Sequence, residues 1–152
     1  MKWNKSDMST YIKAKEYIDT VIVPVIPFQT SKDEELIKDA HAQEVMTFFV
    51  HHLEKELSGR IMLAHSYVYL KSSELDEEIK RINAWVDDIQ SQPFQHIFFI
   101  TYDPKWKKYE KEMKGNLLWL PALQSEEIDV TEPRGIIHEQ VNQVVELIRS
   151  FW

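Results

Sequence analysis

The sequence predicts an α/β fold, a single three-layer sandwich in which a mainly parallel sheet of four to five strands is flanked by helices. Two observations predict it. Short apolar runs recur along the chain, and the segments between them carry apolar residues at helical spacing. The runs are almost continuously apolar instead of alternating, which is typical of parallel strands buried on both faces. No repeat or linker divides residues 1–152, so we expect one domain.

Four apolar runs are the predicted strands. They are Thr20–Val23, Ile61–Ala64, His96–Tyr102 and Leu117–Leu120. The first run continues into Pro24 and Pro27, and proline has no N–H to donate to a central ladder. We therefore expect the first strand to end by about Pro24 and the chain to leave the sheet there.

The intervening segments are the predicted helices. They run from Asp7 or Ser9 to about Ile18, from Ser31 to near Leu57, from Ser72 or Ser73 to Ile89, from Asp103 to Lys114, and from Pro133 to the C-terminus. Ser31 and Glu34 have the spacing of a capping box. Gly59 and Gly115 are expected to end the helices before them. The clearest helical stripe is Leu75, Ile79, Ile82, Val86 and Ile89.

Composition excludes several classes of function. The net charge is -7, so the chain lacks the basic field that binds a phosphate backbone, and we expect no nucleic-acid partner. There is no cysteine, which excludes thiol chemistry and disulfides and fits a reducing compartment. The longest apolar run, Val21–Phe28, is too short to span a membrane, and the N-terminus has no apolar signal core. We expect a cytoplasmic protein with no membrane partner.

Polar side chains follow the predicted strands where a parallel sheet binds ligands, beyond the carboxyl ends. They are His65, Ser66, Thr101, Asp103 and Lys105. These five residues form the candidate ligand edge. Asp103 also has a structural interpretation, because aspartate before a helix accepts hydrogen bonds from the free N–H groups of the first turn.

Specific catalytic chemistries fit this edge poorly. A serine hydrolase could be drawn from Ser66, a histidine and Asp103, but His65 and Ser66 are adjacent and point to opposite sides of an extended chain. A phosphoacceptor site at Asp103 would need carboxylates after the first strand to hold Mg²⁺, where the chain has Pro24 to Pro27. We predict no catalytic residues.

Cofactor and metal motifs are also absent from the sequence. Nucleotide sites need glycines, and the chain has 3, of which only Gly135 lies at a helix start, beside Arg134. The six histidines include no pair at ligand spacing, and His51 and His52 cannot face one ion from a regular helix. We expect no cofactor and no metal.

Several features resemble the YpiF-like family of small uncharacterised bacterial proteins. They are Trp3, Asp7, the stretch Lys15–Thr20 (KEYIDT), Pro24 and Pro27. The resemblance implies a bacterial cytosolic protein from a family with no assigned activity, so it supplies no catalytic residues.

Two functions remain open. The first is a non-catalytic binding or regulatory protein that acts through protein contacts or self-association, favoured by 5 Trp, 6 Tyr and 7 Phe, residue types enriched at interfaces. The alternative is a small-molecule-binding sensor or an enzyme that uses the carboxyl edge of the sheet.

Overall fold

The centre of the protein is a five-stranded parallel sheet, seen here in a computed structural model that describes residues 1–130 and 135–152. Its strands are β1 (Thr20–Phe28), β2 (Ile61–Leu63), β3 (Tyr67–Leu70), β4 (His96–Thr101) and β5 (Asn116–Trp119). The order is β2-β1-β4-β5, and β3 pairs with the second half of β1 in line with β2. The predicted α/β fold with a mainly parallel sheet is confirmed.

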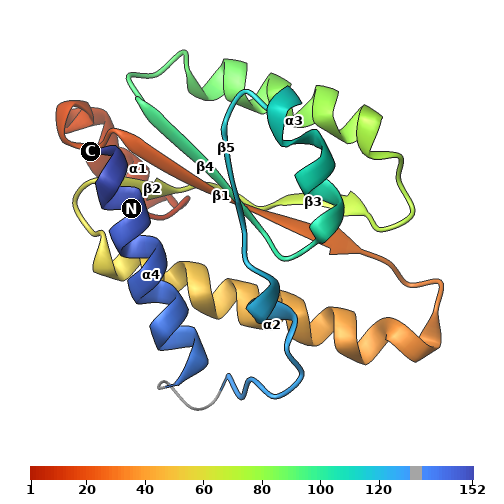
Figure 1. The fold of residues 1–152 in the computed structure, drawn as a ribbon. Helices are drawn as coiled ribbons and strands as arrows, with labels where there is room; N and C mark the ends of the chain where they lie inside the picture. The colour runs from red at the N-terminus through yellow and green to blue at the C-terminus, as the bar shows by residue number, and fades with distance from the viewer. Residues whose placement is uncertain (131–134) are drawn as a thin grey trace.

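Helices cover both faces of the sheet (Figure 1). On one face lie α2 (Asp33–Glu56), α4 (Ile136–Phe151) and the 3₁₀ helix η3 (Pro121–Gln124). On the other lie α1 (Lys5–Lys13), α3 (Leu75–Ile89) and the 3₁₀ helix η2 (Pro104–Glu112). The 3₁₀ turn η1 (Lys15–Tyr17) connects α1 to β1. Below, the two sides are called the α2 face and the α3 face.

β1 continues through both prolines, so the prediction that it ends by Pro24 is wrong. In a parallel strand, alternate residues form their backbone hydrogen bonds with opposite neighbouring strands. The carbonyl of Ile22 accepts from the N–H of Ala64, and that of Phe28 accepts from the N–H of Lys71, so both residues face the β2–β3 side. Pro24 has the same parity, but it lies opposite the gap between β2 and β3. Pro27 has the opposite parity and lies beyond the last paired residue of β4. Neither proline interrupts a ladder bond.

A bulge separates β2 from β3, and the sequence analysis missed β3 altogether. From Ile22 to Val25, β1 advances three residues, while its partner advances four, from Leu63 to Tyr67. The extra residue lies in the segment 64–66. The predicted second strand therefore stops at Leu63, but the partner of β1 resumes at Tyr67 and reaches the carboxyl edge only at Leu70.

The helices begin near the predicted positions, but the residues that cap them differ from the predicted ones. Asn4, and not Asp7 or Ser9, caps α1, which ends at Lys13. The Ser31–Glu34 box does not form. Instead, the Gln29 side chain accepts from the N–H of Lys32 at 2.9 Å. Neither serine at 72 or 73 caps α3 by a side-chain bond.

Two of the three glycines have a positive φ, and the third is required by a close approach. Gly59 follows α2 with φ +91°, so its predicted role as a left-handed terminator is confirmed. Gly115 has no such angle. A Cβ there would lie 2.5 Å from the ring of Phe99, so close approach, not helix termination, requires glycine. Gly135 precedes α4 with φ +109°, while the prediction that Pro133 opens this helix and the placement of Arg134 lie outside the described residues.

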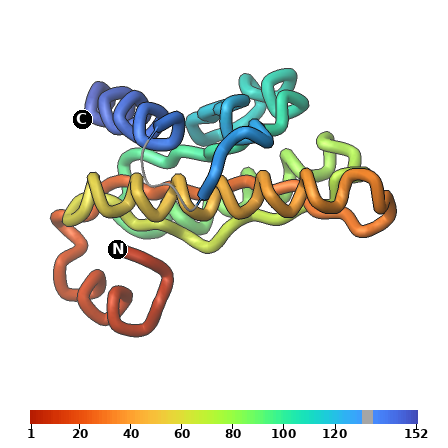
Figure 2. Tube along the Cα trace, turned by 90° about the horizontal axis from the view of Figure 1, so that it is seen from below, coloured from red at the N-terminus to blue at the C-terminus, as the bar shows by residue number. Residues whose placement is uncertain are grey.

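The described residues contain no helix long and apolar enough to cross a membrane. The predicted stripe of α3 is buried, apart from Ile89 at its end. Figure 2, viewed from the α2 face, shows α1 standing beside the body at the β2 edge, away from α4.

Candidate functional site

Asp103 lies in the turn after β4, at the carboxyl edge of the sheet. Its Oδ2 accepts a 2.6 Å hydrogen bond from the hydroxyl of Tyr69, and its Oδ1 accepts from the N–H of Lys105 at 3.0 Å. Its own N–H donates to the hydroxyl of Thr101 at 3.0 Å. Because Lys105 is in the first turn of η2, the predicted role of Asp103 as a helix cap is confirmed. Both carboxylate oxygens have partners within the protein.

The electrostatics of this pair favour a fixed hydrogen bond over proton transfer. Burial raises the pKa of Tyr69 far above its ordinary value of 10.0, and the bond to Asp103 raises it further. Tyr69 therefore stays protonated at neutral pH, and its hydroxyl donates a hydrogen bond to the carboxylate of Asp103. The edge of the Tyr69 ring also meets Trp106, whose ring centroid is 5.2 Å away.

The structure brings together only Thr101 and Asp103 of the five predicted edge residues. The side chain of Lys105 is exposed, and only its backbone N–H contacts Asp103. His65 and Ser66 lie in the bulge between β2 and β3, and at about 3.3 Å per residue His65 is about 13 Å along the strand from Tyr69. The ring Nδ1 of His65 lies 2.8 Å from the carbonyl oxygen of Ser66.

Two buried polar groups near the same edge, the hydroxyl of Tyr102 and Nε1 of Trp106, have no partner among the described residues. The hydroxyl of Tyr102 is buried and, among the described residues, no hydrogen-bond partner lies within reach. Tyr102 points to the α2 face, opposite to Tyr69 and Asp103. Burial raises its pKa, and the negative charges of Asp39 and Asp103 add to the effect. An unpaired buried hydroxyl is unfavourable and needs an explanation.

A second buried tyrosine–carboxylate pair was missed by sequence reasoning. Tyr67 donates to Oε2 of Glu78 at 2.6 Å, and Oε1 of Glu78 accepts from Arg81 at 2.7 Å. Glu78 is buried in the α3 interface although it precedes Ile79 of the apolar stripe by one position. Burial is again the first cause of the raised pKa of Tyr67. This network attaches α3 to β3.

An apolar groove of about 820 Å³ lies between α1 and α3. Val21, Met62 and Ala64 of the sheet form its floor. Its two walls come from the N-terminal segment and from the end of α3 with the loop after it. The residues on these walls are Trp3, Met8, Tyr11, Ile12, Lys15, Ala84, Trp85, Asp88, Ile89, Ser91, Gln92 and Phe94; His65 lies at the edge of the floor. This surface is called the α1–α3 groove below.

Aromatic contacts fix one end of the α1–α3 groove. The rings of Tyr11 and Phe94 stack with centroids 5.4 Å apart, and the hydroxyl of Tyr11 donates to the Gln92 side chain at 3.2 Å. The ammonium of Lys15 lies 5.9 Å from the centre of the Tyr11 ring. At the other end, Trp3 is exposed on the rim. The groove therefore has a formed apolar interior and an open aromatic end.

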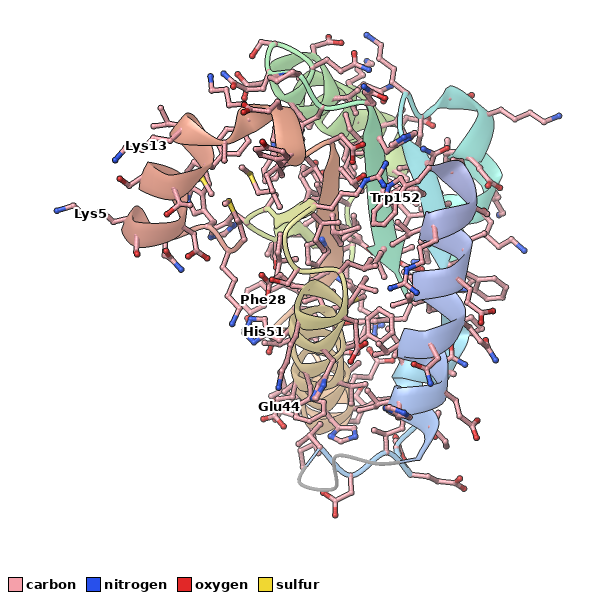
Figure 3. All side chains as sticks on the ribbon, turned by 90° about the vertical axis from the view of Figure 1, so that its left-hand side faces the viewer. Lys5, Lys13, Phe28, Glu44, His51 and Trp152 are labelled. Atoms are coloured by element: carbon pink, nitrogen blue, oxygen red, sulfur yellow. The ribbon has the colours of Figure 1, made fainter. Side chains whose placement is uncertain are left out.

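A smaller pocket of about 360 Å³ lies on the α2 face of the same sheet edge. It shares Trp3, Ala64 and His65 with the α1–α3 groove, so the two hollows flank the bulge from opposite faces. His51 of α2 lines it, and burial lowers the pKa of this histidine. Figure 3 shows His51 on α2 below α1, and Lys5 and Lys13 of α1 extending away from the body.

Metal ligands do not gather in the described parts of the chain. Across residues 1–130 and 135–152, no group of three or more His, Asp or Glu side chains is placed to hold an ion. The carboxylates that lie deepest, Asp103 and Glu78, bond to tyrosines instead.

Comparison with known proteins places the chain in a family. The family model described as "Protein of unknown function (DUF2487)" matches residues 9–152. The chain belongs to this family. It is also similar to "Uncharacterized protein YpiF" of Bacillus subtilis (strain 168), with 22% identity over 152 residues that cover 100% of this chain and 98% of that protein. The resemblance to the YpiF-like family is thereby confirmed.

No solved structure matches the chain. The family match begins at residue 9 and includes α1 from its middle onward, as well as every strand of the sheet. The YpiF match adds the first eight residues, which carry Trp3. Both walls of the α1–α3 groove thus lie in the region that the chain shares with this relative.

Proposed function

We propose that this protein is a non-catalytic binding or regulatory protein that acts through protein contacts, and that the α1–α3 groove is its contact surface. One observation carries the proposal: an apolar groove of about 820 Å³ opens beside exposed Trp3 and Ile12. Large exposed apolar surfaces rimmed by polar residues are typical of interaction sites. Trp and Tyr, both present here, are enriched among residues that dominate binding energy.

The state of the carboxyl edge supports a non-catalytic function. A general acid or base must present its carboxylate to a substrate, whereas Asp103 bonds to Tyr69 and to the start of η2. Thr101 is buried and bonded to Asp103. The His65 imidazole is too distant to act with either residue. The edge stabilises the sheet and offers no assembled acid–base pair.

We propose that the occupant of the groove is an amphipathic helix of a partner protein. An amphipathic helix binds a groove by inserting apolar residues spaced three and four positions apart. Lys15 lies on the α1 wall, and Asp88 lies on the α3 wall. The helix that fits would carry an acidic residue next to Lys15 and a basic residue next to Asp88. In the absence of cysteine, we propose that this contact is made in the cytoplasm.

Site-specific photo-crosslinking in cells tests the proposal. A photoreactive amino acid replaces Ile12 on the groove rim, and a matched control carries it at Ile37, which is also exposed and apolar but lies on α2. We expect a partner protein to crosslink at position 12 and not at 37. With that partner purified, Ile12→Glu should weaken binding at least tenfold, while Ile37→Glu should leave it within twofold. Equal crosslinking at the two positions, or equal affinity of the two variants, would overturn the proposal.

The carboxyl edge retains one observation in favour of the alternative, a small-molecule sensor. The buried Tyr102 hydroxyl without a partner is a group that a bound ligand could satisfy. A thermal-shift screen of metabolites on the wild-type protein tests it, since a ligand of the native state raises the melting temperature. A stabilising metabolite whose effect disappears in Tyr102→Phe supports this alternative, and a shift that survives in Tyr102→Phe excludes the hydroxyl as its site.

A further inference from the structure

The outer edge of β3 has unpaired backbone groups. Lys71, just after β3, donates its N–H to Phe28 of β1, so residues of odd number in β3 face β1 and those of even number face away. Val68 is therefore directed outward. In the described chain nothing bonds to its N–H or C=O, whereas the C=O of Leu70 accepts from Ser73 within the turn. An outward strand edge of this kind is a template for another strand.

The side chains beside this edge are apolar and exposed. Phe28, Val68 and Leu70 are 52%, 53% and 56% exposed. They lie on the α2 face, because Val68 pairs in register with Ile26, which packs on that face, and Leu70 pairs with Phe28, two residues further along β1. Soluble proteins protect strand edges with charged residues, prolines or covering segments. The segment 65–70, HSYVYL, contains no Lys, Arg, Asp, Glu or Pro.

The other two edges differ from β3. Residues 1–2 cover β2: the N–H of Leu63 donates to the Met1 carbonyl at 2.7 Å, and Lys2 bridges to Leu63. On β5, Leu117 and Leu118 are buried, and the Lys107 ammonium lies over the Trp119 ring, 4.4 Å from its centroid. Among the edge strands described, β3 combines open backbone groups with apolar side chains that are more than half exposed. Figure 2 shows the chain between β2 and α3 at the margin of the body, with α1 beside only part of it.

The total surface is larger than that expected of a monomer of this mass. The accessible area is 9024 Å², whereas a monomer of 18.1 kDa exposes roughly 8,100 Å². The surplus of roughly 900 Å² is close to the roughly 800 Å² that each partner buries in a stable interface. A strand that is short, uncharged and apolar on one face can pair with its own copy, because a two-fold axis brings the same patch from both subunits together.

We propose that two copies of this chain associate through antiparallel pairing of their β3 strands, with the two-fold axis at Val68. The N–H and C=O of each Val68 then bond to those of the other copy, which makes a hydrogen-bonded antiparallel pair. Leu70 of one copy faces Ser66 of the other. Since a two-fold axis perpendicular to the sheet keeps the faces in common, the exposed side chains of Phe28, Val68 and Leu70 from both copies gather on one side. The two sheets become a continuous ten-stranded sheet.

The test is sedimentation velocity over a range of concentrations, with variants at Val68. Val68→Pro removes only an outward N–H, so it leaves the bonds to β1 intact and should raise the dimer dissociation constant at least tenfold. The Cα atoms of the two residues at position 68 would lie about 5.5 Å apart across the axis. Val68→Lys and Val68→Glu each place two like charges there, so each variant should be monomeric. An equimolar mixture of the two should recover the dimer, because opposite charges then meet. Ile37→Lys, an equally apolar exposed position on α2, is the matched control and should remain dimeric.

Each outcome of this experiment either supports or overturns the dimer proposal. A wild-type protein that is monomeric at every concentration overturns the proposal, and so does a dimer that persists in both Val68→Pro and Val68→Lys. Failure of the mixture to recover the dimer excludes an axis at Val68. Ile12→Glu should not alter the dimer, since position 12 lies on the α1–α3 groove. The dimer proposal can therefore be overturned while the proposal of partner binding in the groove is supported, and the groove proposal can be overturned while the dimer proposal is supported.

Discussion

The hydroxyl of Tyr69 and Oδ2 of Asp103 lie 2.6 Å apart, and their hydrogen bond ties the edge strand β3 to the turn after β4 across the end of β1. β1 extends four residues beyond its last partner in β4, so its carboxyl end depends on β3 for backbone pairing. The bond lies on the α3 face of the sheet beside these four residues, where Trp106 also packs on Tyr69. Asp103, which its position after a predicted strand made a candidate for ligand binding, thus forms a structural bond with Tyr69.

Tyr69→Phe should destabilise the protein by about 1–3 kcal/mol, because it leaves a buried carboxylate oxygen without its donor. Tyr17→Phe is the matched control. Tyr17 is exposed, and its loss of a hydroxyl should change stability by no more than about 0.5 kcal/mol. Urea unfolding followed by circular dichroism measures both. Equal midpoints for the two variants would contradict a structural bond between Tyr69 and Asp103.

Tyr102→Phe should stabilise the protein, in contrast to Tyr69→Phe. The substitution keeps the ring and removes a buried hydroxyl that has no partner, so we expect stability to rise by up to about 1 kcal/mol. The same urea experiment measures it beside Tyr69→Phe. A loss of stability comparable with that of Tyr69→Phe would mean that the hydroxyl of Tyr102 is satisfied in solution, for example by an internal water.

Alkaline pH should unfold the protein through its buried tyrosines. Burial raises the pKa values of Tyr67, Tyr69 and Tyr102 above their ordinary 10.0. Above pH 10 the unfolded chain therefore releases protons that the native state retains, and stability falls as pH rises. Phenolate absorbance should show these three of the 6 tyrosines ionising only together with the loss of structure. Their ionisation in a chain that remains folded would contradict their burial.

Gly115→Ala should destabilise by about 1–3 kcal/mol through overpacking, because the new Cβ would meet the Phe99 ring, itself fully buried. Phe99→Leu in the same chain should recover part of this loss, since it removes the atoms in the way. Gly59→Ala provides the control. Its cost arises from a positive φ, with open space around the position, so Phe99→Leu should add to it without compensation.

The sequence predicted the layers of the fold because burial of strands on both faces and one-sided burial of helices leave different periodicities. The stripe from Leu75 to Val86 is buried as expected, and the apolar run of β4 lies at the centre of the sheet. Gly59 was recognisable because a left-handed residue after a helix has a strong preference for glycine. Gly115 was not, since the requirement comes from a ring that is distant in sequence.

β3 was missed because four residues, Tyr67–Leu70, follow a histidine and a serine and carry no glycine or proline boundary. The general rule about proline in strands also failed for β1. That rule concerns ladder bonds, and the positions of Pro24 and Pro27 outside those bonds depend on where the neighbouring strands stop. Local sequence does not contain this information.

Of the candidate edge residues, Thr101 and Asp103 meet, but His65 and Ser66 lie where the sheet has not yet ended. Whether any of these residues binds a ligand remains a prediction. The α1–α3 groove was not foreseen, although Met8, Tyr11 and Ile12 have the spacing of an apolar helical face. What the sequence could not show is that α1 stands away from α3 and leaves this face partly uncovered.

The bulge between Leu63 and Tyr67 decides which face the side chains of β3 take. Leu63 lies on the α2 face, and four regular strand steps would return Tyr67 to that face, whereas the bulge places Tyr67 opposite Val25 on the α3 face. Removing one residue from the segment 64–66 would leave three regular steps, so Tyr67 and Tyr69 would still face Glu78 and Asp103. In an alignment of relatives that share this sheet, a one-residue deletion between Leu63 and Tyr67 should therefore be tolerated, whereas a two-residue deletion would turn each side chain of β3 to the other face.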